Sequence, residues 1–271
     1  MVGVKFIASV SFGKDSLAML LRLMEENAPL DTVVFYDTGM EFDSIYRNRD
    51  KAVGILAQKG IEFVELHPKE PFLFSMLKRE VKYRKKEGSH FGLGWCGGPC
   101  RWGTTQKVQA ITAYRRTITE PVTDYVGIAF DEPERFGKAS HDGKTLPLVD
   151  WQMTEKDCLT YCRSCGWDWN EHTANGVIDL YDVLSRVSCW CCKNKNLSEL
   201  RNMYLFLPEY WERLKQLQTE IEMPMKGSAG SVFDLERRFR LEQDWLNAGL
   251  SIRSKQFFDE LHTKHEGMEE Q

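Results

Sequence analysis

The stretch that most constrains how this chain can fold is Ser9–Ser16, which reads Ser-Val-Ser-Phe-Gly-Lys-Asp-Ser. A short, mostly apolar run at residues 4–10 leads into it and is long enough for one buried strand. Beyond it, apolar residues recur at the spacing of one helical face, namely Leu17, Leu20, Leu21 and Met24. A glycine-containing turn between a strand and a helix points backbone N–H groups and the positive end of the helix dipole at one place. The sequence therefore predicts a strand–turn–helix unit that suits a phosphate.

The side chains of this turn support the same interpretation. Lys14 adds a mobile positive charge, and hydroxyl donors come from Ser9, Ser11 and Ser16. The spacing of the Walker motif, Gly-x4-Gly-Lys-Ser/Thr, is absent. The stretch is thus a phosphate-binding loop of another kind, and an ordinary strand–turn–helix without a ligand is the alternative.

A second strand is predicted over residues 31–37, where Val33, Val34 and Phe35 form the continuous apolar run of a parallel strand. The carboxyl ends of such strands are where ligands bind in open α/β sheets. Asp37 and Thr38 stand at that end and could hold a nucleotide ribose, a base or magnesium. Helix capping by Asp37 or Asp43 is the structural alternative.

The elements that follow predict the fold class. A helix is expected over 43–59, a third strand over 62–66 and a fourth strand over 125–130. Strands and helices thus alternate along the chain, which indicates an α/β fold with a right-handed parallel sheet. The part from Asn196 is rich in helix formers, with helices expected over 197–206, 209–222 and 233–248. We predict two domains: a nucleotide-binding domain with the cysteine cluster over 1–195, and a helical C-terminal extension over 196–271.

Eight cysteines fall into three groups. Cys158, Cys162 and Cys165 follow one face of a helix expected over 155–165, where Thr154 and Asp157 form an approximate capping box, and such a stripe is typical of buried packing. The other two groups lie far apart in sequence, as in many metal or iron–sulfur sites. They contribute five thiols, of which four could be ligands: Cys96, Cys100, Cys189, Cys191 and Cys192.

Composition limits the compartment and the partners. The net charge is −4, so binding to nucleic acid would depend on a local basic patch. The densest one lies at residues 78–86, within a segment, 71–88, that we expect to be helical; a solvated face is the alternative. No apolar run approaches the ~20 residues of a membrane span, and the first residues do not read as a signal peptide. These features predict a cytoplasmic protein.

Several separated motifs together resemble the phosphoadenosine phosphosulfate reductase-like branch of the PP-loop ATP pyrophosphatase superfamily. The loop resembles the signature Ser-Gly-Gly-Lys-Asp-Ser, with Phe12 where the first glycine usually stands. The other matching stretches are Tyr36–Phe42, Gly127 with Asp131, Glu132 and Arg135, Pro147–Trp151, and Ser188–Cys192.

The resemblance implies a Rossmann-like parallel sheet flanked by helices, of the adenine nucleotide alpha-hydrolase type, with ATP and Mg²⁺ over the loop. Lys14 and Asp15 would then act in catalysis. The implied nucleotide-binding residues are Ser9, Ser11, Phe12, Gly13, Lys14, Asp15, Ser16, Asp37, Thr38, Gly127 and Arg135.

Two departures from the family direct the functional prediction. Adenylylsulfate reductases hold a 4Fe–4S cluster with adjacent cysteines and a Cys-x-x-Cys pair, whereas here the pairs are Cys96-x-x-x-Cys100 and Cys189 with Cys192. We predict that these four hold a 4Fe–4S cluster, with zinc as the alternative and Cys191 able to replace Cys192. Sulfonucleotide reductases also carry a nucleophilic cysteine in a C-terminal tail, and no cysteine follows Cys192 here.

We therefore predict an enzyme that cleaves ATP between the α- and β-phosphates to activate an acceptor for sulfur transfer, with nucleic acid as acceptor, as in DNA phosphorothioation. A sulfonucleotide reductase that releases sulfite is one alternative. A nucleotide-sensing binding module with a redox cluster is another. The expected partners are an adenine nucleotide, nucleic acid at residues 78–86 and a sulfur donor such as a cysteine desulfurase, with no membrane.

Overall fold

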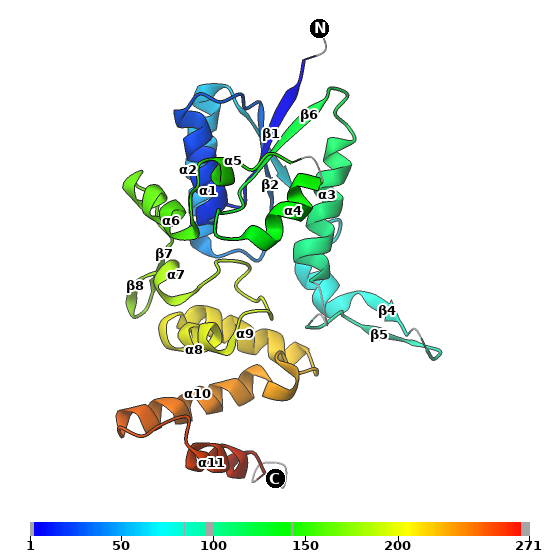
Figure 1. Ribbon diagram of the computed structural model, residues 1–271. Coiled ribbons are helices and arrows are strands. Elements are labelled where there is room, and N and C mark those ends of the chain that lie inside the picture. Colours follow the sequence, from blue (N-terminus) through cyan, green and yellow to red (C-terminus); the bar gives the residue numbers. More distant parts are fainter. Residues whose placement is uncertain (1–2, 84, 96–99, 142–143, 267–271) are drawn as a thin grey trace.

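The computed structural model describes residues 3–83, 85–95, 100–141 and 144–266, and its centre is a parallel sheet (Figure 1). Four strands, β1 (Lys5–Ser9), β2 (Thr32–Tyr36), β3 (Glu62–Leu66) and β6 (Val122–Val126), lie in the order β3-β2-β1-β6. All three strand pairs are parallel. The predicted α/β fold with a parallel sheet flanked by helices is confirmed.

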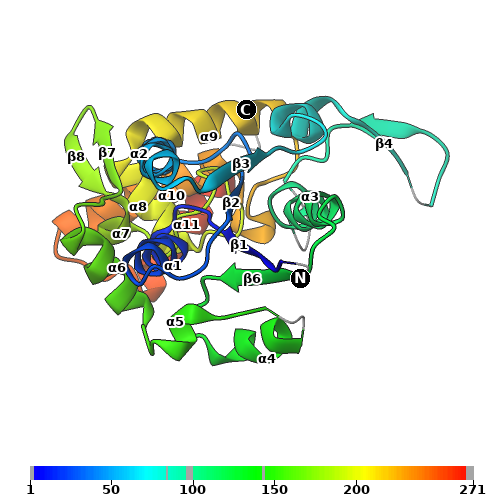
Figure 2. The same ribbon diagram turned by 90° about the horizontal axis from the view of Figure 1, so that it is seen from above.

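Helices cover both faces of this sheet. Figure 2 shows α1 (Lys14–Glu25) and α2 (Asp43–Lys59) on one face and α3 (Gln106–Arg115) on the other. The predicted apolar face of α1 packs inward, with Leu17 and Leu20 fully buried. α6 (Glu155–Ser164) packs beside α1, and it begins with the predicted capping box of Thr154 and Asp157. These helices fix the loop before α1 at the carboxyl edge of the sheet.

Smaller elements complete this half of the chain. They are α4 (Pro133–His141), α5 (Pro147–Asp150), the hairpin of β7 (Asn170–Thr173) and β8 (Gly176–Asp179), and α7 (Leu180–Val183). Of the predicted cysteine stripe on α6, Cys158 and Cys162 are buried and Cys165 is exposed. Burial raises the pKa of the Cys158 thiol to about 12, so this thiol behaves as an apolar packing group.

The C-terminal helices lie beyond the carboxyl ends of the strands, below the sheet in Figure 1. They are α8 (Leu197–Phe206), α9 (Pro208–Glu220), α10 (Val232–Asn247) and α11 (Lys255–Glu266), of which the last was not predicted. One buried apolar cluster runs from the sheet into these helices, and the rings of Phe42 and Tyr210 lie 4.8 Å apart across the junction. The division into 1–195 and 196–271 stays a prediction.

The segment 71–88, predicted to be helical, is helical only in its first part. A π-helical turn, Phe74–Lys78, is followed by an antiparallel hairpin of β4 (Glu80–Lys82) and β5 (Ser89–Phe91). Eight of the ten residues at 78–87 are charged, so this second part has no apolar face with which a helix could pack. Gly88, whose φ is +102°, lets the chain return into β5.

The fourth strand is also displaced, since β6 ends at Val126 rather than Phe130. The cause lies at Gly127, where an added Cβ would come within 2.8 Å of Ser16 Cα. The chain leaves the sheet here to pass against the first turn of α1, and only glycine permits so close an approach.

Candidate functional site

The loop between β1 and α1 is held by hydrogen bonds that close it around the start of the helix. Gly13 stands before the first helical residue, Lys14, with no side-chain cap. The backbone N–H of Ser11 donates to Ser16 Oγ at 3.1 Å, and Ser16 Oγ donates to the carbonyl of Gly13 at 3.2 Å. The loop therefore places the N-terminus of α1 at the carboxyl edge of the sheet, as an anion site requires.

Phe12 stands in the loop in a left-handed conformation, with φ of +58°. This explains why a glycine suits the position, because a side chain is strained there. Burial offsets the strain: the ring is fully buried, 5.2 Å from the ring of Phe35, and Trp169 Nε1 donates to the Phe12 carbonyl at 2.8 Å. The Phe12 side chain thus supports the loop from the core side.

A cavity of about 320 Å³ lies over this loop. Seven of the predicted nucleotide-binding residues line it: Ser11, Gly13, Lys14, Asp15, Ser16, Gly127 and Arg135. The other four predicted residues are not among the described residues that line this cavity: Ser9, Phe12, Asp37 and Thr38. Ser9 lies in β1, while Asp37 and Thr38 border a separate cavity next to the end of β2.

Lys14 is buried and lines the cavity. Its Nζ contacts Glu155 Oε2 at 2.6 Å and Asp15 Oδ2 at 3.3 Å, and it lies 5.4 Å from the centre of the Tyr181 ring. Burial alone would lower the pKa of Lys14, but the charges of Asp15 and Glu155 outweigh burial and hold this pKa above its ordinary value. The ammonium group is therefore charged and held where a phosphate would meet the loop.

Asp15 is an unusual carboxylate, because one of its oxygens, Oδ1, is buried without a hydrogen-bond partner. Burial raises the pKa of Asp15 to about 6, against the lowering effect of Lys14. An orphaned carboxylate oxygen beside a phosphate-binding loop is the kind of ligand that Mg²⁺ takes together with nucleotide phosphates. The residues at the loop thus fit a magnesium ion, which Asp15 would hold.

The raised pKa of Asp15 predicts a specific dependence of stability on pH. The folded state binds this proton more tightly than the unfolded chain, whose aspartates titrate near 3.8. Asp15 therefore contributes stability at low pH, and the contribution is lost as the pH rises from about 4 to about 6. Relative to Asp15→Asn, the free energy of unfolding of the wild type should fall by on the order of 2 kcal/mol across this window. Urea unfolding of both proteins at a series of pH values measures this difference in the free energy of unfolding. A difference that stays the same at every pH would contradict the prediction.

Sequence reasoning missed several residues around the cavity. Glu155, Tyr181 and Lys195 line it but follow Lys14 by 141, 167 and 181 positions in the sequence. Tyr181 OH accepts the backbone N–H of Lys14 at 2.9 Å, and this contact ties the loop to α7. The capping box before Glu155 marked the start of α6, but no local signal showed that this start faces the loop.

Lys195 is the most deeply buried cation of this site, with 2 % of its surface exposed. Burial lowers its pKa, while Cys192 and Glu199 act in the opposite direction. Its Nζ lies 3.4 Å from the carbonyl oxygen of Arg186 and 5.3 Å from the centre of the Phe42 ring. The chain thus places a desolvated ammonium group beside both the cavity and the thiols.

Four of the cysteines singled out from the sequence come together around a second, smaller cavity of about 40 Å³: Cys100, Cys189, Cys191 and Cys192. Cys96, the fifth, lies outside the described residues. None of the seven described cysteines forms a disulfide. The Cys189 Sγ lies 3.4 Å from Thr38 Oγ1 and 3.6 Å from Glu41 Oε1.

The surroundings of these thiols fit a metal group. Trp95 borders the small cavity, and its indole N–H is buried without a hydrogen-bond partner, so it is an unused donor beside the sulfur atoms. Burial raises the pKa of Cys189 and Cys191 well above their ordinary value. Without a metal these thiols keep their protons, and a metal group would bind them with release of protons.

Cys192 lies at the boundary between the two cavities. It lines both the cavity over the phosphate-binding loop and the cavity among the cysteines, as does Asn194. Cys191 lines only the cysteine cavity and is buried. The two predicted sites are therefore neighbours.

The loop, its lining and the parallel sheet can now be compared with known proteins. Residues 5–85 match the family described as the phosphoadenosine phosphosulfate reductase domain. The resemblance predicted from the motifs is confirmed over these residues, which include the loop and the end of β2. The solved structure of the U34-tRNA thiolase NcsA from Methanococcus maripaludis with its [4Fe-4S] cluster is similar at a TM-score of 0.42 and 14% identity, over 94% of this chain and 77% of that one. No curated protein matches the chain.

None of the described helices combines the length and the apolar character that a bilayer span requires.

Proposed function

We propose that this protein binds ATP over the Ser9–Ser16 loop and cleaves it between the α- and β-phosphates, which activates an acceptor for sulfur transfer. The proposal rests on two charged residues at the start of α1, Lys14 and Asp15. Lys14, which is charged, and Asp15, which has one buried oxygen without a hydrogen-bond partner, both line one cavity at the N-terminus of the helix. This combination suits a triphosphate with its metal ion rather than a neutral ligand.

The proposed reaction assigns roles to residues of the cavity. An oxygen of the acceptor attacks the α-phosphorus, the bond to the bridging oxygen breaks, and pyrophosphate leaves with the bonding electrons. The Lys14 ammonium and the N–H groups at the start of α1 stabilise the charge on the leaving phosphates. Bound Mg²⁺ would supply further charge neutralisation of the phosphates. Arg135 borders the same cavity and offers a second cation to the nucleotide.

The cysteine site belongs to the same proposal. Cys100, Cys189 and Cys192, with Cys96, would hold the 4Fe–4S cluster, and zinc remains the alternative. A bound cluster would supply a place for sulfur or a brace for the fold. Because Cys192 lines both cavities, sulfur held there would lie next to the nucleotide. The sulfur itself must come from a donor, and we propose a persulfide-forming partner such as a cysteine desulfurase.

The products of ATP turnover test the proposal. Purified full-length protein is incubated with ATP labelled at the α-phosphate, Mg²⁺ and candidate acceptors. We expect AMP or an adenylated acceptor together with pyrophosphate. Release of ADP and inorganic phosphate would refute cleavage at the α–β bond. Tight ATP binding without turnover for every acceptor would favour a nucleotide-sensing module.

A second measurement separates the proposed reaction from sulfonucleotide reduction. A reductase needs a thiol that reaches the sulfur, but residues 193–271 contain no cysteine, and Cys158, Cys162 and Cys191 are buried. Cys165 is exposed, but it stands at the end of α6 and does not line the loop cavity. Burial raises the pKa of the Cys158 thiol, which lowers its nucleophilicity at neutral pH. We therefore expect negligible sulfite release from either adenosine sulfonucleotide in the presence of thioredoxin. Robust sulfite production that disappears in Cys191→Ser would replace the proposal with the reductase alternative.

We also propose that the acceptor is nucleic acid, in the form of duplex DNA, bound by the hairpin of β4 and β5. Six lysine and arginine residues against two glutamates give residues 78–91 a net charge of +4, so the rest of the chain carries −8. The hairpin projects from the body of the molecule (Figures 1 and 2). A two-stranded ribbon of this kind fits the major groove of B-form DNA.

Aromatic groups accompany the charges on the hairpin. The rings of Tyr83 and His90 lie 5.3 Å apart, and Lys86 Nζ lies 4.1 Å from the centre of the Tyr83 ring. Phe91 is 74 % exposed, which is unusual for a large apolar side chain. A basic ribbon with exposed rings can contact both phosphates and bases.

Charge reversal on the hairpin tests this surface. The triple variant Lys82→Glu, Lys85→Glu, Lys86→Glu should weaken binding to a 20-base-pair duplex by at least ~10-fold and reduce the salt dependence of binding. The control carries the same change of net charge at exposed lysines elsewhere, Lys59→Glu, Lys156→Glu, Lys255→Glu, and should bind within about 2-fold of the wild type. Equal losses in both variants would refute the hairpin as the binding surface. Tighter binding to duplex RNA would refute DNA as the acceptor.

A further inference from the structure

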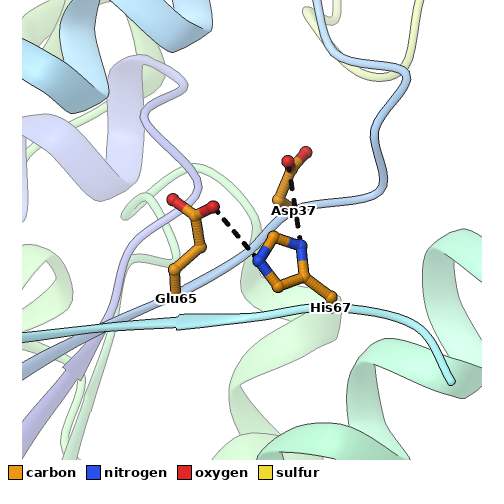
Figure 3. Close-up of side chains that lie close together, drawn as sticks. All are labelled: Asp37, Glu65 and His67. Atoms are coloured by element: carbon orange, nitrogen blue, oxygen red, sulfur yellow. Dashed lines mark ion pairs between the residues drawn. The ribbon is translucent and has the colours of Figure 1, made fainter.

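Three side chains that can bind a metal ion meet at the carboxyl edge of the sheet, and none of them lines the loop cavity or the cysteine cavity. Asp37 follows β2, Glu65 lies in β3, and His67 follows β3, as Figure 3 shows. One ligand atom from each lies within 4.8 Å of the other two. Among the described residues, no other group of three histidine, cysteine or carboxylate side chains has its ligand atoms this close together.

Each carboxylate has one oxygen anchored by groups outside the trio. Asp37 Oδ1 accepts hydrogen bonds from Tyr46 OH at 2.9 Å and from the backbone N–H of Gly39 at 2.7 Å. Glu65 Oε2 pairs with Arg49 Nη1 at 3.2 Å. Anchored in this way, the two carboxylates have fixed orientations, as carboxylate ligands of metal sites commonly have.

The remaining oxygens point at the imidazole of His67. Asp37 Oδ2 lies 4.0 Å from Nδ1, and Glu65 Oε1 lies 3.3 Å from Nε2 (Figure 3). The His67 side chain is 58 % exposed, so it can turn to present one nitrogen to an ion between the two oxygens. Asp37 and His67 also border a cavity of about 350 Å³, which leaves room for water or a ligand on the open side of an ion.

We propose that Asp37, Glu65 and His67 form a binding site for a divalent transition-metal ion, separate from the phosphate-binding loop and from the cysteine cavity. Two carboxylate oxygens and one imidazole nitrogen suit Mn²⁺, Fe²⁺, Co²⁺ or Zn²⁺, whereas Mg²⁺ prefers oxygen ligands alone. The open coordination positions face the cavity. The proposal goes beyond ATP cleavage and does not depend on it.

Titration with Mn²⁺ alone tests the site. Mn²⁺ is paramagnetic and prefers oxygen and nitrogen to thiolate, so the cysteines compete little for it. The full chain, stripped with EDTA and free of nucleotide, is titrated while free Mn²⁺ is measured by electron paramagnetic resonance. We expect about one Mn²⁺ per chain, and we expect His67→Ala to weaken binding by at least ~10-fold because one of three protein ligands is lost. Asp37→Asn should do the same.

Matched variants exclude other sites. His90→Ala removes an exposed histidine on the hairpin and should leave Mn²⁺ binding unchanged. His172→Ala removes a second exposed histidine, on the hairpin of β7 and β8, and should also bind as the wild type does. Thermal unfolding of His67→Ala serves to check that this variant is folded. We expect it to be folded because the His67 side chain is exposed. Absence of saturable binding, or equal binding by His67→Ala and the wild type, would overturn the proposal. Because no nucleotide is present, either result leaves the proposed ATP cleavage untouched.

Discussion

Replacement of Lys14 by alanine is expected to lower pyrophosphate release from ATP by about 10²- to 10³-fold, the usual cost of removing one preorganised donor to transition-state charge. Lys14 lines the loop cavity, and its ammonium group is paired with Asp15 and Glu155 at 3.3 and 2.6 Å. When a triphosphate enters, its charge competes with these carboxylates for the same cation. Steady-state pyrophosphate release from purified variants measures the effect.

The control for this prediction lies on the neighbouring helix. Lys156→Ala removes an exposed lysine next to Glu155 and should leave turnover within about 2-fold of the wild type. Lys14→Ala also leaves two carboxylates without their cation, which can destabilise the fold. The double variant Lys14→Ala, Glu155→Gln removes part of that repulsion and should remain as inactive as the single variant. Wild-type turnover in either Lys14 variant would end the assignment of the loop.

The sheet and its helices were largely predictable because their patterns are local. The boundaries predicted for α2 and β3, residues 43–59 and 62–66, are those observed. The hairpin at 80–91 was not predictable in the same way, since its strands are three residues long and its charges hid any alternation. The displaced end of β6 depends on a tertiary contact between Gly127 and Ser16, which no local pattern reveals.

The site was predictable only where it consists of contiguous residues. The loop motif identified Lys14 and Asp15, but Glu155, Tyr181 and Lys195 reach the cavity through the packing of α6, α7 and the loop before α8. Phe12 illustrates the reverse case. The resemblance implied that Phe12 binds the nucleotide, and this stays a prediction, but its side chain is buried in the core, where it contacts Phe35. Burial of a large ring is favourable enough to hold the strained backbone.

Replacement of Cys189 by alanine is expected to abolish the cysteine-bound metal group. Its thiol lies near Thr38 and Glu41, and it shares the small cavity with Cys100 and Cys192. Loss of one of four thiolates leaves an iron without its protein ligand, so the cluster should not survive purification. Wild-type protein purified without oxygen should contain about four irons and four sulfides per chain, and the variant close to none.

Cys165→Ala is the matched control, because this cysteine is exposed at the end of α6 and does not line the cysteine cavity in the described part of the chain. Its iron and sulfide content should equal that of the wild type. Cys191→Ala and Cys192→Ala then decide which neighbouring thiol is the ligand. Only Cys192 also borders the nucleotide cavity, so we expect Cys192→Ala to lose the cluster and Cys191→Ala to keep it. Stoichiometric zinc without sulfide in the wild type would contradict the cluster but keep the four-thiolate site, and unchanged metal content in Cys189→Ala would contradict both.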